Sequence, residues 1–114
     1  MNTKPNECWA SESNPRTLRI DLSGEQSLLL PLNHFLFAEI LIKKDEQEIR
    51  ALFLTHEVLL RGTGLRRIQS ALQRLELSYL CCMPSYFEKI IPEGQPVIRS
   101  IQVKMAHPEQ NAVD

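Results

Sequence analysis

The alternation of hydrophobic and polar positions is clearest in two segments, one near each end of the chain. In residues 17–23, Leu18, Ile20 and Leu22 share one parity and polar side chains occupy the other. A period of two is typical of a β-strand with one buried face. Residues 96–105 alternate in the same way, so both segments are predicted to be half-buried strands.

Shorter apolar runs between these two segments predict further strands. Turn residues separate the runs, and the charged turn at 44–46 suits the tip of a hairpin. Pro31 restricts the first run to an edge or an end of a sheet, because proline lacks the N–H that a central strand donates. The expected strands are at 27–31, 35–43, 48–55, 57–61 and 78–83.

One helix is predicted, over residues 65–77. Leu65, Ile68, Leu72 and Leu75 follow one another at spacings of three, four and three, which places them on one helical face. Thr63 is positioned to cap the first turn.

Sequential strands joined by short connections favour an antiparallel arrangement. We therefore expect an α+β fold: an antiparallel β-meander of about five to seven strands with one amphipathic helix packed on one face. Its single domain would span 16–105, with a flexible N-terminal arm at 1–15 and a flexible tail at 106–114.

The strand at 35–43 is apolar on both faces. One parity is wholly apolar and is expected to face the core: Leu36, Ala38, Ile40 and Ile42. The other parity also carries large apolar side chains: Phe35, Phe37 and Leu41. Because a single helix cannot cover both faces of a sheet, the surplus face predicts a second sheet layer or a partner chain. The leading hypothesis is a non-enzymatic protein-interaction or oligomerisation module, forming a homo-oligomer or binding another protein.

Trp9 is the one large aromatic residue of the polar N-terminal arm. A large aromatic side chain is seldom left in water. We expect Trp9 to pack against its own domain or against a like subunit, which makes it an interface candidate.

Composition narrows the cellular setting. The chain has 114 residues, is 43% hydrophobic and 24% charged, and has a net charge of −1 with a pI near 6.3. Bulk binding of polyanions such as nucleic acid, which would favour a basic chain, is disfavoured but not excluded. No apolar stretch reaches membrane-spanning length. The first 15 residues lack the apolar core of a signal peptide, and Cys8, Cys81 and Cys82 form no CxxC pair. A reducing, cytoplasmic location away from the membrane is expected.

A basic run supplies an alternative function, phosphate or nucleic-acid binding. Glycines before a helix leave backbone N–H groups available to bind an anion, and arginines add bidentate contacts to phosphate. The complete P-loop and dinucleotide-binding patterns are absent from the run. The candidate ligands are Arg61, Gly62, Gly64, Arg66, Arg67 and Arg74.

A second alternative is a small enzyme that uses His56 and Glu57 for acid–base catalysis, with His34 as a possible partner. The histidines lack the close spacing of a zinc site, so no metal or cofactor is predicted. The adjacent Cys81 and Cys82 could be reactive thiols only if a neighbouring cation lowered their pKa.

Overall fold

The computed structural model describes residues 8–82 and 94–106, which form eight strands, one α-helix and one short 3-10 helix. In chain order the elements are β1 (Trp9–Ser11), β2 (Thr17–Ser23), β3 (Gln26–Pro31), η1 (Leu32–His34), β4 (Phe35–Ile42), β5 (Gln47–Phe53), β6 (His56–Thr63), α1 (Arg66–Gln73), β7 (Leu77–Cys81) and β8 (Val97–Met105). Residues 107–114 of the expected flexible tail lie outside the described residues.

The strands divide between two four-stranded sheets, where a single meander was expected. One, with strand order β4-β5-β6-β8, is antiparallel throughout and is called the β4 sheet below. The other, with order β1-β7-β2-β3, is called the β2 sheet. The expected meander is therefore correct for β4, β5 and β6 and wrong for β7, which leaves the β4 sheet and pairs in parallel with β2.

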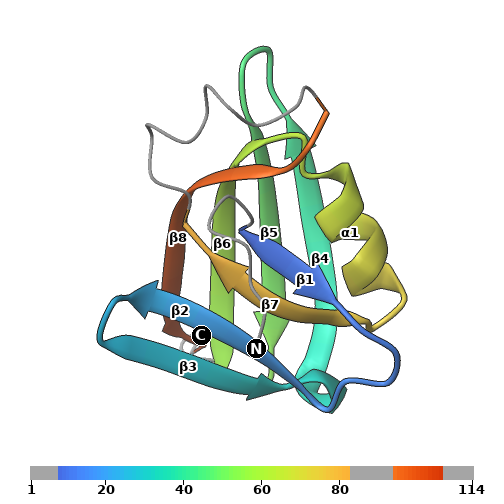
Figure 1. Ribbon diagram of the computed structural model, residues 1–114, viewed down its shortest axis with the longest axis vertical. Coiled ribbons are helices and arrows are strands. Elements are labelled where there is room, and N and C mark those ends of the chain that lie inside the picture. The colour runs from blue at the N-terminus through green and yellow to red at the C-terminus, as the bar shows by residue number, and fades with distance from the viewer. Residues whose placement is uncertain (1–7, 83–93, 107–114) are drawn as a thin grey trace, which may run out of the picture.

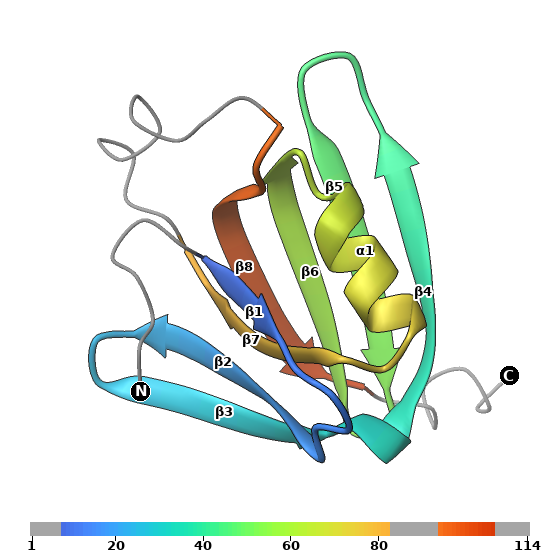
Figure 2. The same cartoon turned by 45° about the vertical axis from the view of Figure 1, so that its right-hand side comes forward.

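The two sheets form two layers. The strands of the β2 sheet run across those of the β4 sheet, and α1 lies beside the β2 sheet over β4 and β5 (Figures 1 and 2). The β2 sheet and α1 thus share the task of covering one face of the β4 sheet. Between the layers lies one cluster of buried apolar side chains that includes Ile20, Phe53 and Ile68.

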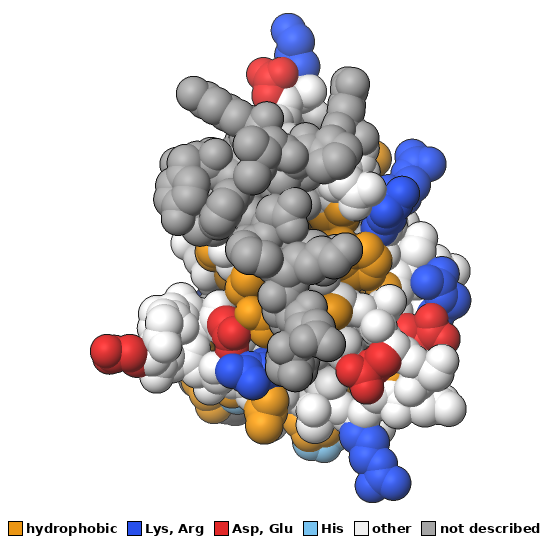
Figure 3. Space-filling view, viewed as in Figure 1, with side chains coloured by type: hydrophobic (Ala, Val, Ile, Leu, Met, Phe, Trp, Pro, Cys, Tyr) orange, Lys and Arg blue, Asp and Glu red, His pale blue; other side chains and the backbone are white. Residues whose placement is uncertain are grey.

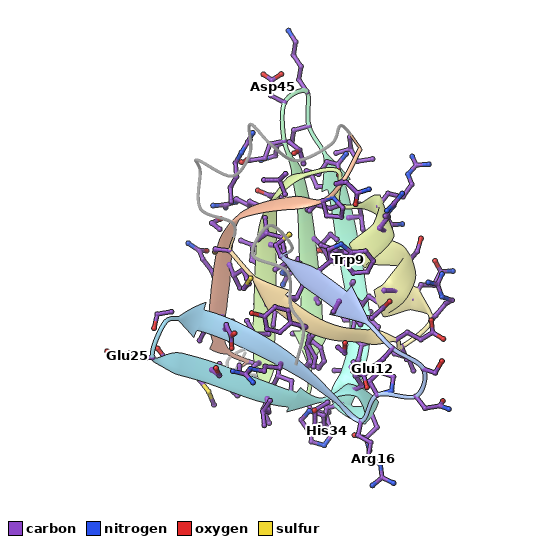
Figure 4. The ribbon with its side chains drawn as sticks, in the orientation of Figure 1. Trp9, Glu12, Arg16, Glu25, His34 and Asp45 are labelled. Carbon is purple, nitrogen blue, oxygen red and sulfur yellow. The ribbon has the colours of Figure 1, made fainter. Side chains whose placement is uncertain are left out.

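The described part of the domain begins at Cys8, earlier than the expected boundary at residue 16. Cys8 is buried, and residues 9–11 pair antiparallel with β7. Trp9 is half-buried against the core, as the preference of a large aromatic for contact predicts (Figure 4). The expectation of a flexible arm up to residue 15 overlooked this strand because three residues are too few to show alternation.

Helix α1 is shorter than its hydrophobic pattern suggests. Leu75 adopts a left-handed φ of 57°, and the N–H groups of Leu75 and Glu76 donate to the carbonyls of Leu72 and Ala71. These two bonds are a Schellman motif, which ends a helix. Leu75 therefore leaves the apolar stripe and is exposed, and Leu77 begins β7.

The helix also begins without the expected cap. Thr63 ends β6, and the N–H of Leu65 instead donates to Oε1 of Gln47 at 2.8 Å. Within the described residues, no helix is long and apolar enough to cross a membrane.

Candidate functional site

The most prominent unexplained surface lies along β4. Five of its eight residues are large apolar side chains with exposed fractions from 39% to 67%. We call them the β4 strip: Leu36, Phe37, Ile40, Leu41 and Ile42. Exposed apolar side chains are ordinary when scattered, but five on one edge strand, divided between its two faces, are a concentration of the kind found at interaction sites.

A bulge in β4 changes the expected assignment of its two faces. The register with β5 shifts between Phe35 and Phe37, so residues on either side of Leu36 change parity relative to the core. Phe35, expected on the outer face, turns inward and its ring lies 5.5 Å from that of Phe53. Phe37 and Leu41 remain on the outer face, opposite Leu52 and Glu48.

The β4 side chains on the inner face of the sheet are only partly covered, although the sequence predicted that they face the core. Ala38 lies opposite the buried Ala51 and is itself half-buried, whereas Ile40 and Ile42 are exposed. Helix α1 does not seal this edge of the sheet. A groove of about 310 Å³ remains between β4 and α1, lined by Phe35, Ala38 and Ile40 on one side and Gln69, Leu72 and Gln73 on the other.

Ion pairs neutralise the charged side chains on the outer face of the β4 sheet. Arg50 contacts Glu39 at 2.7 Å and Glu57 at 2.5 Å. Glu48 accepts from Arg61 at 2.8 Å, which is the main cause of the lowered pKa of its carboxyl, and also from Lys43. These six charged side chains are therefore paired across neighbouring strands, and Phe37 and Leu41 of the β4 strip flank Glu39 on the same face.

The residues of the basic run do not gather on one surface. Arg61 lies on the outer face of the β4 sheet, whereas Arg66, Arg67 and Arg74 belong to α1 and its C-terminus. Arg67 donates to Gln95, and Arg74 pairs with Glu76. The side of the molecule that carries α1 shows both Lys or Arg and Asp or Glu side chains (Figure 3). Because the arginines are spread over two surfaces, the structure weakens the argument that they form one basic site for an anion. Anion binding stays a prediction.

Both glycines of that run have a steric role. A Cβ on Gly62 would lie 1.9 Å from the carbonyl oxygen of Val97, because β8 approaches β6 closely there. Gly64 has a left-handed φ of 63°, and a Cβ there would lie 2.7 Å from the carbonyl oxygen of Gln95. Only glycine satisfies either requirement without a shift of the backbone.

His56 and Glu57 point to opposite faces of β6, because successive side chains alternate along a strand. Nδ1 of His56 is 2.7 Å from the hydroxyl of Thr55, while Glu57 is bound by Arg50. Nδ1 of His34 is buried and has no hydrogen-bond partner. Among the described residues, no three His, Cys, Asp or Glu side chains gather where they could hold a metal ion.

A polar cluster on the β2 sheet was not anticipated from the sequence. Asp21 accepts hydrogen bonds from Ser27 at 2.6 Å, Tyr79 at 2.7 Å and Arg19 at 2.9 Å. Desolvation opposes ionisation of Asp21, but these three donors prevail and lower the pKa of its carboxyl. The donors and the acceptor of this cluster all belong to the β2 sheet, and their hydrogen bonds connect β2, β3 and β7.

The thiols carry no sign of activation. Burial raises the pKa of Cys8 to about 11, and desolvation also raises the pKa of Cys81 and of Cys82. A reactive cysteine needs the opposite shift.

A second, more open groove of about 740 Å³ lies where residues 14–17, 31–33 and 74–76 meet. Arg16 and His34 lie at this end of the molecule (Figure 4). Its lining includes Arg74, which is already paired with Glu76. Asn14 and Leu75, the two non-glycine residues with positive φ in the described part of the chain, also lie here and serve the chain reversals.

Comparison with known proteins gives no match: no family model, no curated protein and no solved structure is significantly similar to this chain. Function must therefore be argued from the chain's own surface.

Proposed function

We propose that this protein is a non-enzymatic interaction module that associates with a second copy of itself through the β4 strip. The observation that carries the proposal is the concentration of exposed apolar side chains on this one strand. Large apolar surfaces of this kind are costly in water and are typically covered in an assembly.

The charge pattern around the strip supports association more than ligand chemistry. The neighbouring carboxylates of Glu39, Glu48 and Glu57 are already bound by arginines of the same sheet. Such a surface offers a partner apolar contact without leaving an unpaired charge at the interface.

Sedimentation velocity over a range of micromolar concentrations tests the proposal. We expect a dimer whose fraction rises with concentration. Ile42 is 67% exposed, so Ile42→Lys should leave the monomer folded while it weakens the dimer. Burying one isoleucine contributes about 1.5–3 kcal/mol, and the change occurs in both copies, so the dimerisation constant should weaken by about 100-fold or more.

Leu29→Lys is the matched control. Leu29 is 59% exposed on β3 of the other sheet, so the same change of charge there should leave the dimer intact. A wild-type chain that stays monomeric throughout, or an equal loss in both variants, would refute the proposal.

A further inference from the structure

We infer that two copies pair β4 with β4 in antiparallel orientation, centred on Leu41, so that their β4 sheets become one continuous sheet. This inference rests on the proposed self-association and specifies its geometry. The partner is a second copy of this chain, because the complementarity described below arises from the β4 sequence itself.

The edges of the two sheets differ in how well they are protected. Natural edge strands avoid unwanted pairing by being short, or by carrying proline, charged residues or bulges. Strand β1 has three residues, β3 ends in Pro31, and β8 carries Arg99 and Lys104 and is bulged against β6. Residues 37–42 of β4 are regular and contain no proline, and their one charged side chain, Glu39, is paired with Arg50 of β5. Of the four edges in the described structure, β4 is the one open to pairing.

The backbone of β4 has donors and acceptors in position for a partner. The N–H of Lys43 donates to the carbonyl of Glu46 within the hairpin. Hydrogen-bonded positions alternate along an antiparallel ladder, so residues of the same parity as Lys43 face β5. The N–H and C=O groups of Ala38, Ile40 and Ile42 therefore face the free edge.

Side-chain complementarity selects the register. With Leu41 on the two-fold axis, it lies opposite its own copy. Glu39 then lies opposite the second copy's Lys43, an attractive pair on the outer face. Ile40 lies opposite the second copy's Ile42, an apolar pair on the inner face.

Two alternative registers, centred on Glu39 and on Ile40, are less favourable. Centring on Glu39 places two carboxylates directly opposite each other, and like charges in that position are destabilising. Centring on Ile40 places Glu39 against Leu41 and Lys43 against Phe37. Neither register satisfies the charges and the apolar side chains together.

The groove beside α1 gives the inner-face side chains of the second copy a place to lie. An added strand continues the inner face of the β4 sheet, so the second copy's Ile42 would lie beside Ile40, which lines the groove. The α1 side of the groove is uncharged, with Gln69, Leu72 and Gln73. Ile42 is the most exposed large apolar side chain of the described residues, and this pairing would cover it.

Cross-linking through one introduced cysteine tests the register. We would make Glu39→Cys, Ile40→Cys and Leu41→Cys separately in the full chain carrying Cys82→Ser, which removes the exposed native thiol. A residue cross-links to its own copy only on or beside the two-fold axis. For a non-hydrogen-bonded pair on the axis, Cα atoms lie roughly 4.5 Å apart, within the range of a disulfide.

We expect Leu41→Cys to form a covalent dimer under mild oxidation, seen on a non-reducing gel, and the other two variants to form several-fold less. In this register the two copies of residue 39 are displaced by roughly 13 Å along the strands, and those of residue 40 are roughly 8 Å apart. The Cys82→Ser parent alone should give no covalent dimer.

A maximum at residue 39 or 40 would overturn the register. Absence of cross-linking in all three variants, with a dimer still present by sedimentation, would overturn β4 pairing and leave the proposed self-association standing. A chain that is monomeric by sedimentation would overturn both.

Discussion

Replacing Gly62 by alanine should destabilise the fold strongly. The added Cβ would lie 1.9 Å from the carbonyl oxygen of Val97 and 2.9 Å from its carbonyl carbon. Both atoms belong to the backbone of β8 and cannot rotate away. The Cβ–oxygen separation would have to increase from 1.9 Å to at least 3.0 Å, which requires β8 to move away from β6.

The cost of this movement can be bounded. Overpacking one methyl group in a rigid site costs about 1–3 kcal/mol, and more where the backbone must shift. Since the obstruction here is backbone, we expect a loss of at least ~3 kcal/mol in the free energy of unfolding. For a domain of this size that corresponds to a fall in Tm of at least ~10 °C.

Urea unfolding followed by circular dichroism, together with a thermal scan, measures both quantities. Gly24→Ala is the matched control, because no atom lies within 4 Å of its added Cβ and its φ is not left-handed. It should change the unfolding free energy by less than about 1 kcal/mol. If Gly62→Ala were as stable as Gly24→Ala, the steric explanation of Gly62 would be wrong. A role of Gly62 in anion binding would then become the better explanation.

Three further predictions follow from packing, helix termination and charge. Phe53 is 1% exposed, so Phe53→Ala should lower the unfolding free energy measured by urea titration by about 3–5 kcal/mol. Leu54 is 52% exposed, so Leu54→Ala should lower it far less. Equal effects would contradict the placement of Phe53 between the two layers. Leu75→Gly should raise the free energy of unfolding by about 0.5 kcal/mol, because glycine tolerates the left-handed φ, whereas Leu75→Val should lower it by about 1 kcal/mol. Thermal scans that rank the two variants in the reverse order would argue against a Schellman motif at the end of α1. The pKa of Asp21 is lowered in the folded state, so the stability that ionised Asp21 contributes should be present above its unfolded pKa and lost as the pH falls through its folded pKa. Ser27→Ala should raise the folded-state pKa of Asp21 in an NMR titration. An unchanged pKa would show that the hydrogen bond from Ser27 is unimportant.

Local patterns predicted much of the β-structure. The strand at 17–23 has the expected bounds, and the hairpin formed by β4 and β5 follows from two apolar runs around a charged turn. These features depend on residues near one another in sequence, where alternation and turn composition carry the information.

The division into two sheets could not be predicted in this way. Strand β7 pairs with β1 and β2, whose residues precede it by more than fifty positions, and its alternation would look the same in either sheet. Gly62 was interpreted as a candidate for anion binding because its proximity to Val97 is visible only in three dimensions. A non-local contact leaves no periodic signal at the position that makes it.

The surface along β4 was anticipated in part. Phe37 and Leu41 lie on the outer face as expected, but the bulge turns Phe35 inward, and a bulge shifts parity without changing composition. Ile40 and Ile42 were expected in the core. They are exposed because α1 does not cover this edge of the β4 sheet, and a groove remains between α1 and Ile40.

The position of β7 between β1 and β2 also sets an order of events during synthesis. Among the described strands β1 pairs with β7 alone, so residues 9–11 can join the sheet only after residues 77–81 have left the ribosome. Hairpins such as β2–β3 and β4–β5 can close earlier, because their strands are adjacent in sequence. Closing so long a loop is entropically costly, and the insertion of β7 between β1 and β2 is therefore expected to be a slow step of folding.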